Sequence, residues 1–297
     1  MGVKQLNKFL KLNCKNSIQK IDLGFLKNKK IVVDTSIYMY RYSGNKNLIE
    51  SFYMMCSIFV KYEIVPLFVF DGKPPKEKEN EIKKRNNDKK KAKSEYDKLK
   101  EKLLEVDDSD TKIEIESQMD KLRKKFLKIR KEDVINVKKL IQSFGMSYID
   151  APEESDVMCA YMCNSNKVYA CLSEDMDMFI YGCPIILRYF SLLKNNCIMY
   201  NLNDILNELN IDKENFKKIC ILSGTDYNNR YMNIFESFNE WKNNNLNYDE
   251  DILNKINNLF NIDYDKYSKF NKYLIKNTHI KYQELKNILD IYNFIFL

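Results

Sequence analysis

The chain has 297 residues, 44% of them apolar, which is enough for a large folded core and excludes a wholly disordered protein. Its formal net charge of +7 is concentrated in one segment, because 13 lysines and arginines against 7 acidic residues lie between Lys73 and Lys102. We therefore expect a polyanion to bind at that segment. The single histidine, His279, excludes chemistry built on pairs of histidines.

The sequence contains no run of about 18 uncharged apolar residues, so we expect no membrane span and no membrane partner. The eight cysteines are scattered without a C-x-x-C pair, which favours reduced, buried thiols. These features predict an intracellular protein. It would be nuclear if the chain is cellular, or would act at a cytoplasmic replication site if the chain is viral.

Short β-forming apolar runs alternate with helical patterns along the chain. The predicted strands span 31–34, 64–70, 146–150 and 168–172, and two more at 184–190 and 197–202 have the form of a hairpin. Helical spacing covers 3–12, about 48–62, the stretch from 156 and most of 205–222. This alternation predicts an α/β fold with a mainly parallel twisted sheet and helices on both faces.

From residue 76 to about 143 the spacing is helical and the segment is strongly charged. Apolar stripes on two successive helices are formed by Tyr96, Leu99 and Leu103, and by Ile115, Met119, Leu122, Phe126 and Ile129. The pattern predicts an inserted helical hairpin. A solvated spacer would show the same stripes, but the positive excess lies on the first limb beside Asp71, which favours a basic arch over the sheet edge.

Acidic residues follow several of the predicted strands and helices. The set is Asp34, Asp71, Glu154, Asp156, Asp175, Asp177 and Asp226. Carboxyl ends of parallel strands gather at one sheet edge, where carboxylates would repel one another and raise each other's pKa values. Two Mg²⁺ ions about 4 Å apart would neutralise them and suit phosphodiester hydrolysis, and we expect Mn²⁺ to substitute. For the stretch around Asp175 alone, an acidic helix cap is the competing interpretation.

The chain resembles the XPG-type structure-specific 5′ nucleases, the family of the flap endonucleases. The matching stretches, in the family's order, are MGVKQL, IVVDTSIYMY, FVFDGKPP, APEESD, VYACLSEDMD and ILSGTDY. Related exoribonucleases share the MGV-like start but match the other stretches less well. The resemblance implies a PIN-like nuclease core over 1–227, with a basic helical arch inserted at 72–143. A helical region over 228–297 would carry a degenerate duplex-binding motif.

The resemblance also implies roles for single residues. Asp34, Asp71, Glu154 and Asp156 would serve one metal, and Asp175, Asp177 and Asp226 the other. Lys78 and Arg85 match a basic pair that contacts the scissile phosphate, and seven residues of helix place both on one face. Tyr40 matches an aromatic that stacks on a base, with a core residue as the alternative, and Gly2 matches a glycine packed near the active site. We assign Lys73, Lys83, Lys84 and Arg230 to nucleic-acid binding as well.

Three departures from the family's pattern affect these expectations. Asp156 stands where the family usually has glutamate, and the chain between Asp34 and Asp71 is short, which would trim the wedge that opens a junction. The turn after Asp226, YNNRYMNIFESFNEW, lacks the glycines that allow close backbone approach to phosphate. We expect the duplex grip to be weakened or rebuilt around Arg230 and Lys242. No sliding-clamp motif is recognisable at the end of the sequence.

The sequence thus predicts a Mg²⁺-dependent nuclease that cuts DNA at 5′ flaps or junctions in replication and repair. The alternative enzyme is a 5′→3′ exonuclease or an RNA-directed nuclease on the same scaffold, which the missing glycines and short wedge favour. A binding scaffold without catalysis is the alternative of a different class, but it would have no use for clustered carboxylates.

Overall fold

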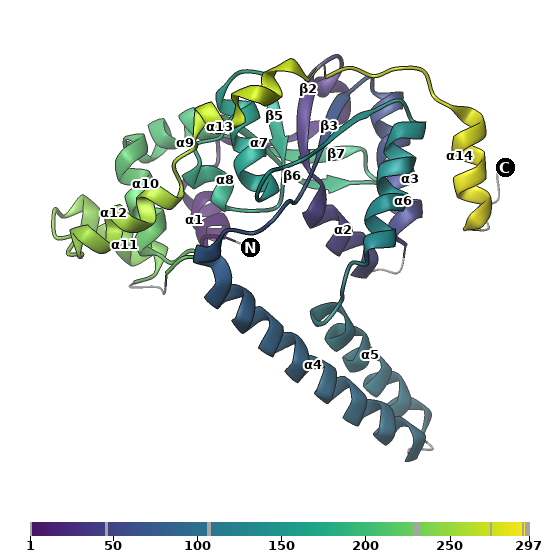
Figure 1. Ribbon diagram of the computed structural model, residues 1–297. Coiled ribbons are helices and arrows are strands. Elements are labelled where there is room, and N and C mark those ends of the chain that lie inside the picture. The colour runs from purple at the N-terminus through teal and green to yellow at the C-terminus, as the bar shows by residue number, and fades with distance from the viewer. Residues whose placement is uncertain are drawn as a thin grey trace.

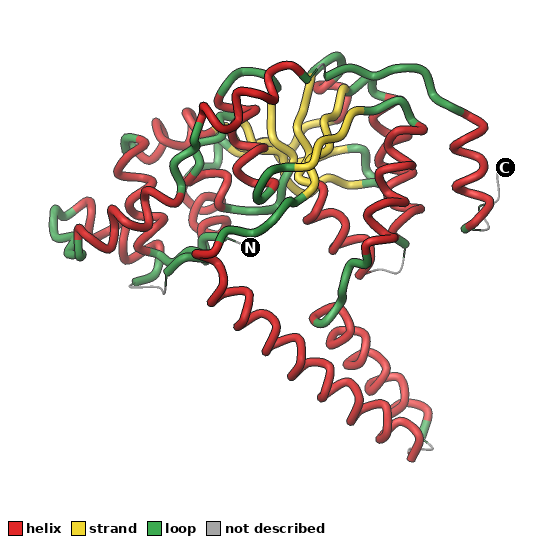
Figure 2. Tube along the Cα trace, viewed as in Figure 1, coloured by secondary structure: helices red, strands yellow, loops and turns green. Residues whose placement is uncertain are grey.

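A computed structural model describes residues 2–44, 47–105, 108–228, 232–273, 275–292 and 294. One twisted seven-stranded sheet lies between two layers of helices, and a long helical hairpin projects from it (Figures 1 and 2). No helix within those residues is long and apolar enough to cross a membrane.

The sheet has the strand order β1-β7-β6-β5-β2-β3-β4. The strands are β1 (Ile18–Asp22), β2 (Lys30–Asp34), β3 (Val65–Phe70), β4 (Ser147–Asp150), β5 (Ala170–Leu172), β6 (Ile185–Ser191) and β7 (Asn196–Asn201). Strands β4, β3, β2, β5 and β6 are parallel, whereas β7 is antiparallel to β6 and β1. The mainly parallel sheet and the β6–β7 hairpin confirm the predicted α/β fold, but the edge strand β1 was not predicted.

Alternate residues of the central strands face two separate cores. Val32 points into one core, and Ile31 and Val33 point into the other. All three side chains are fully buried, which explains why the strand is a continuous apolar run rather than an alternating one.

Helices cover both faces of the sheet (Figure 1). One layer contains α1 (Leu6–Asn13), α7 (Ser155–Asn164), α8 (Asp177–Ile180), α9 (Leu202–Leu209), α10 (Lys213–Leu222), α11 (Ile234–Lys242), α12 (Glu250–Leu259) and α13 (Tyr264–Ser268). The other contains α2 (Thr35–Gly44), α3 (Leu48–Lys61), α6 (Lys131–Ser143) and α14 (Tyr282–Ile291).

The inserted hairpin consists of α4 (Glu79–Glu105) and α5 (Ser109–Lys125). Ala92, Ile115 and Met119 are buried between its limbs, and the rings of Tyr96 and Phe126 meet at 5.4 Å. Helix α6 lies outside the hairpin and packs on the sheet through Val137 and other apolar residues. The hairpin therefore ends well before residue 143, where the sequence pattern placed the end of the insertion. The pattern extended the insertion too far because the helical spacing of apolar residues continues into α6.

Residues 275–281, which precede α14, have no regular secondary structure and pass the start of β4 (Figure 2). Thr278 N donates to Gly145 O and Lys281 N donates to Ser143 O, both at 2.8 Å. This strap positions α14 against α3 and α6, where Leu289 is fully buried.

Candidate functional site

The register of β2 and β5 brings acidic side chains to one edge of the sheet. Val33 pairs with Leu172, so Asp34 and Ser173 follow neighbouring strands at the same level. Ser173 Oγ donates to Asp34 Oδ2 at 2.8 Å. Asp34 is only 2% exposed, and its carboxylate is therefore held rigidly inside the fold.

Ser155, the first residue of α7, connects Asp34 to Asp71. Its Oγ lies 2.9 Å from Asp34 Oδ1 and 2.7 Å from Asp71 Oδ1, while its backbone N–H donates to Asp71 Oδ1 at 2.9 Å. A hydroxyl carries one proton and can donate to only one carboxylate at a time. Ser155 and Ser173 were not predicted as site residues, although each stands inside a motif that supplied predicted ligands.

Asp175 and Asp177 lie in the turn that follows β5. Asp175 N donates to Ser173 Oγ, and Asp177 N donates to Asp175 Oδ1, both at 3.0 Å. Asp177 Oδ1 is buried and has no hydrogen-bond partner among the described residues.

Gly2 packs directly onto this turn, as the resemblance implied. Its φ is +75°, and a Cβ atom there would lie 2.5 Å from Asp177 Oδ1 and overlap Asp175 Oδ1. Only glycine fits this combination of positive φ and close approach.

Two cations at the base of the hairpin meet the acidic edge. Lys78 Nζ lies 2.7 Å from Glu154 Oε2 and 3.8 Å from Asp226 Oδ2, and Arg85 Nη2 donates to Asp226 Oδ2 at 2.6 Å. Burial lowers the pKa of Lys78, but Glu154 and Tyr227 outweigh that effect and the net pKa is raised. Both cations therefore stay charged while they face the acidic cluster.

The acidic side chains of this cluster outnumber the two cations beside them, Lys78 and Arg85. Burial, followed by repulsion from Asp71, raises the pKa of Asp34 to about 8. Burial and the charges of Asp34 and Asp175 raise the pKa of Asp156, and burial with Asp175 does the same for Asp177. These interactions place five acidic side chains, those of Asp34, Asp71, Asp156, Asp175 and Asp177, in one pocket.

The residues present fit divalent metal ions that keep much of their water. No three acidic, His or Cys side chains within the described ranges surround one point closely enough to ligate a single ion. Mg²⁺ binds through one or two carboxylates and retains several waters, so it does not need such a cage. The unpartnered Asp177 Oδ1 and the raised pKa values show that the pocket favours added positive charge.

A polar network outside the predicted set holds the Asp175–Asp177 turn. Glu174 accepts hydrogen bonds from Tyr189 N at 2.7 Å and from Arg41 at 3.2 Å. The buried Arg188 donates to Glu174 O at 3.0 Å and to Asn7 Oδ1 at 2.8 Å, which ties α1 to the same turn. Glu174 was not among the predicted ligands, although it stands inside the stretch that supplied Asp175 and Asp177, and neither Arg41 nor Arg188 carries a local signal.

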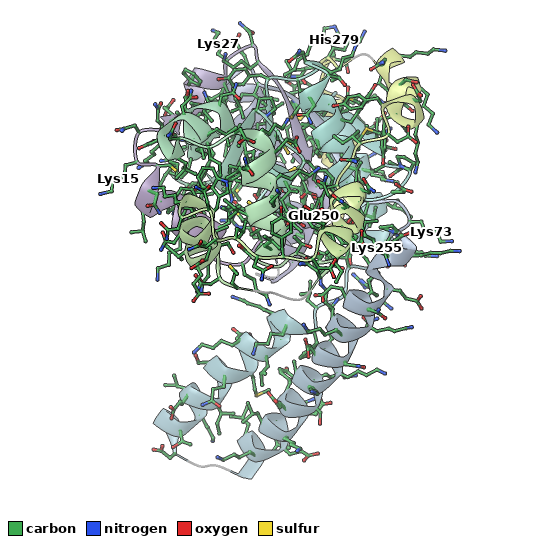
Figure 3. All side chains as sticks on the ribbon, turned by 90° about the vertical axis from the view of Figure 1, so that its left-hand side faces the viewer. Lys15, Lys27, Lys73, Glu250, Lys255 and His279 are labelled. Carbon is green, nitrogen blue, oxygen red and sulfur yellow. The ribbon has the colours of Figure 1, made fainter. Side chains whose placement is uncertain are left out.

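The predicted nucleic-acid contacts lie outside the pocket. Tyr40 is 48% exposed with Lys89 Nζ 5.5 Å from its ring centre, so it is not a core residue. Lys73 extends outward where the hairpin begins (Figure 3), and Lys83 pairs with Glu79 at 2.9 Å. Lys84 is exposed, and Arg230 lies outside the described residues.

The fold and this acidic edge define a PIN-like 5′ nuclease core. The structure resembles the catalytic core of Rad2 in complex with DNA substrate, with a TM-score of 0.64, 21% identity and coverage of 98% of this chain and 95% of that one. It also resembles flap endonuclease-1 from Methanococcus jannaschii, with a TM-score of 0.59, 22% identity and coverage of 93% and 95%.

The sequence comparisons identify the family. The XPG N-terminal domain matches residues 1–92, and the XPG I-region matches residues 145–226. Flap endonuclease 1 of Encephalitozoon cuniculi is 31% identical over 249 residues, covering 76% of this chain and 68% of that protein. Flap endonuclease 1 of Cryptosporidium parvum is 32% identical over 258 residues, but the match spans only 50% of its length. The chain belongs to the XPG-type family of flap endonucleases.

Proposed function

We propose that this chain is a Mg²⁺-dependent structure-specific nuclease that cuts DNA near 5′ flaps or junctions. The observation that supports this most strongly is the meeting of Lys78 and Arg85, from the hairpin, with Glu154 and Asp226 at the sheet edge. Cations and carboxylates from separate segments converge where a phosphodiester would need both.

The chain's own residues would position the scissile phosphate. Lys78 and Arg85 would exchange part of their contact with Glu154 and Asp226 for the phosphate oxygens, where they offset developing charge. Tyr40 has the exposed ring needed to stack on a neighbouring base. The lack of a side chain at Gly2 leaves the rim of the pocket open.

Asp34, Asp71, Glu154 and Asp156 would hold one metal, and Asp175, Asp177 and Asp226 the other, in part through water. When bound, the two ions would activate the attacking water and stabilise charge on the phosphate. Ser155 and Ser173 would keep Asp34 and Asp71 in place by the hydrogen bonds described above.

DNA is proposed as the substrate because related proteins are seen with it. The Rad2 core was solved with a DNA substrate, and human GEN1 was solved with Holliday junction DNA, with a TM-score of 0.65, 17% identity and coverage of 99% of this chain and 74% of that one. The turn after Asp226 has no glycine up to residue 241, which keeps an exonuclease or an RNA-directed nuclease as the second candidate.

The test is a double variant, Asp175→Asn/Asp177→Asn, assayed on flap, nicked, blunt and RNA-tailed substrates with Mg²⁺ or Mn²⁺. We expect the variant to bind flap DNA but not to cut it, while the exposed-residue control Asp265→Asn/Asp290→Asn cuts normally. Full cleavage by the double variant would refute the proposal. Preferred cutting of blunt or RNA-tailed substrates by the unaltered chain would favour the second candidate.

A further inference from the structure

Four lysines lie on or beside α1. Lys4, Lys8, Lys11 and Lys15 are all exposed: Lys8 and Lys11 share the solvent side of the helix, Lys4 lies two residues before its first residue and Lys15 two residues after its last. The opposite side is buried through Leu6, Phe9 and Leu10. We call the four residues the α1 lysine row.

The positive charge of this row is not neutralised within the protein. None of the four lysines lies within 4.0 Å of a carboxylate in the part of the chain that the structure describes. Lys11 Nζ instead rests 4.6 Å from the ring centre of Tyr189. Near Lys15, the Glu208 carboxylate is occupied by hydrogen bonds from Ser17 and Asn16.

The row starts beside the acidic pocket and leads away from it. Gly2, two residues before Lys4, packs against Asp175 and Asp177. Lys15 and Lys73 lie on opposite flanks of the molecule (Figure 3), so the row extends on the flank away from the start of the hairpin.

We propose that the α1 lysine row binds the phosphate backbone of the DNA duplex adjoining the cut, which rests on the proposed function. A straight row of cations suits the regular charge of a duplex, with one phosphate per about 1.7 Å of axis. Single-strand binding relies on several stacked aromatic rings, whereas the aromatic ring recorded beside this row, that of Tyr189, is in contact with Lys11 Nζ. The turn after Asp226 lacks the glycines that allow close backbone approach to phosphate. The α1 lysine row would supply phosphate contacts elsewhere on the protein.

The experiment measures binding without cleavage. The full chain in EDTA is titrated with a blunt 20-base-pair duplex and, separately, with a single strand, across a series of NaCl concentrations. The variant is Lys8→Gln/Lys11→Gln/Lys15→Gln, which leaves Lys4 intact because of its closeness to Gly2. The control, Lys30→Gln/Lys61→Gln/Lys167→Gln, removes the same charge from exposed lysines at the opposite edge of the sheet. Thermal melting confirms that both variants are folded.

We expect the slope of log K against log salt for the duplex to become less negative by about 2 to 3 in the row variant, since each lost phosphate contact removes about 0.9. Duplex affinity at 100 mM salt should fall at least tenfold, with single-strand binding and the control variant unchanged. An unchanged slope, an equal loss in the control, or no duplex binding by the unaltered chain would overturn the inference. If the row binds duplex but flaps are not cut with Mg²⁺, the proposed function fails while this inference stands.

Discussion

The ammonium group of Lys78 lies 2.7 Å from Glu154 Oε2, at the point where the hairpin leaves the sheet. Lys78 is 5% exposed, so this ion pair is largely removed from solvent. Glu154 directly precedes α7 and Lys78 directly precedes α4, so one contact fixes the base of the hairpin relative to the acidic pocket. The pair is therefore a structural tie, and it holds the positive charge of Lys78 where the proposed function needs it for a phosphate.

Replacing Lys78 with methionine should lower the cleavage rate at saturating flap substrate by roughly 10²- to 10³-fold, as expected when a charge that stabilises the transition state is lost. Substrate binding should fall much less, because the other contacts remain. Single-turnover kinetics separate the two effects. The control is Lys167→Met, an exposed lysine at the far edge of the sheet. A normal rate for the Lys78 variant would contradict its assigned role.

Asp156→Asn should stabilise the metal-free protein by about 1 kcal/mol, because a neutral amide avoids the burial and the repulsion from Asp34 and Asp175 that raise the pKa of the Asp156 carboxyl. The same change should reduce the stabilisation that added Mg²⁺ provides, since a ligand is lost. Thermal unfolding with and without Mg²⁺ measures both effects. Asp290→Asn, at an exposed site on α14, should change neither. If Asp156→Asn lowers metal-free stability, the crowding of charge in this pocket is not destabilising.

Gly2→Ala should reduce cleavage at least tenfold, because its Cβ would overlap the carboxylates of Asp175 and Asp177 at a positive φ. The overall stability should change little, as the residue precedes α1. Gly44→Ala is the matched control, since a Cβ there would meet only Lys124 Cγ at an ordinary 3.7 Å. Cleavage assays on both variants decide the point, and equal activity would show that the turn tolerates the methyl group.

The stability of the protein should depend on pH through the hydrogen bond between Ser17, which precedes β1, and Glu208 on α9. Ser17 Oγ donates to Glu208 Oε2 at 2.5 Å, and this bond, with backbone N–H donors, lowers the pKa of Glu208. A lowered folded-state pKa gives stability that is present above the ordinary value and is lost as pH falls through the folded value.

The test compares unfolding of the native chain and Glu208→Gln. The native chain should be the more stable at pH 7, and the two should converge below about pH 4. Glu284→Gln, on the exposed face of α14, is the control and should show a smaller difference at pH 7. A constant gap between Glu208→Gln and the native chain down to pH 3 would mean that the charge of Glu208 plays no part.

Local sequence patterns were sufficient to predict those features that depend on residues close together in the sequence. Apolar runs such as 31–33 and 168–172 predicted central strands because strands buried on both faces must be continuously apolar. The ends of those strands predicted the acidic edge, because parallel strands bring their carboxyl ends together. The spacing of seven residues predicted that Lys78 and Arg85 share a helix face, and both side chains lie beside Asp226 although Lys78 directly precedes α4.

Local patterns failed where a role depends on a distant segment. The sequence could not separate α6 from the hairpin, since the helical spacing is the same and only packing on the sheet distinguishes them. Nor could it identify Arg188, which is buried and meets Glu174 and Asn7 only after the sheet forms. The sequence could not identify Ser155 either, because its hydroxyl lies between Asp34 and Asp71 only after the chain has folded.

By itself the sequence determined the central strands, the acidic residues at their ends and the basic character of the insertion, because each depends on the type and spacing of nearby residues. Only the tertiary structure decided which charges meet. It paired Lys78 with Glu154 and Arg85 with Asp226, and left the α1 lysine row without a carboxylate partner among the described residues. Electrostatic interactions depend on distance in space, and segments far apart in the chain acquire their distances only when the sheet brings them together.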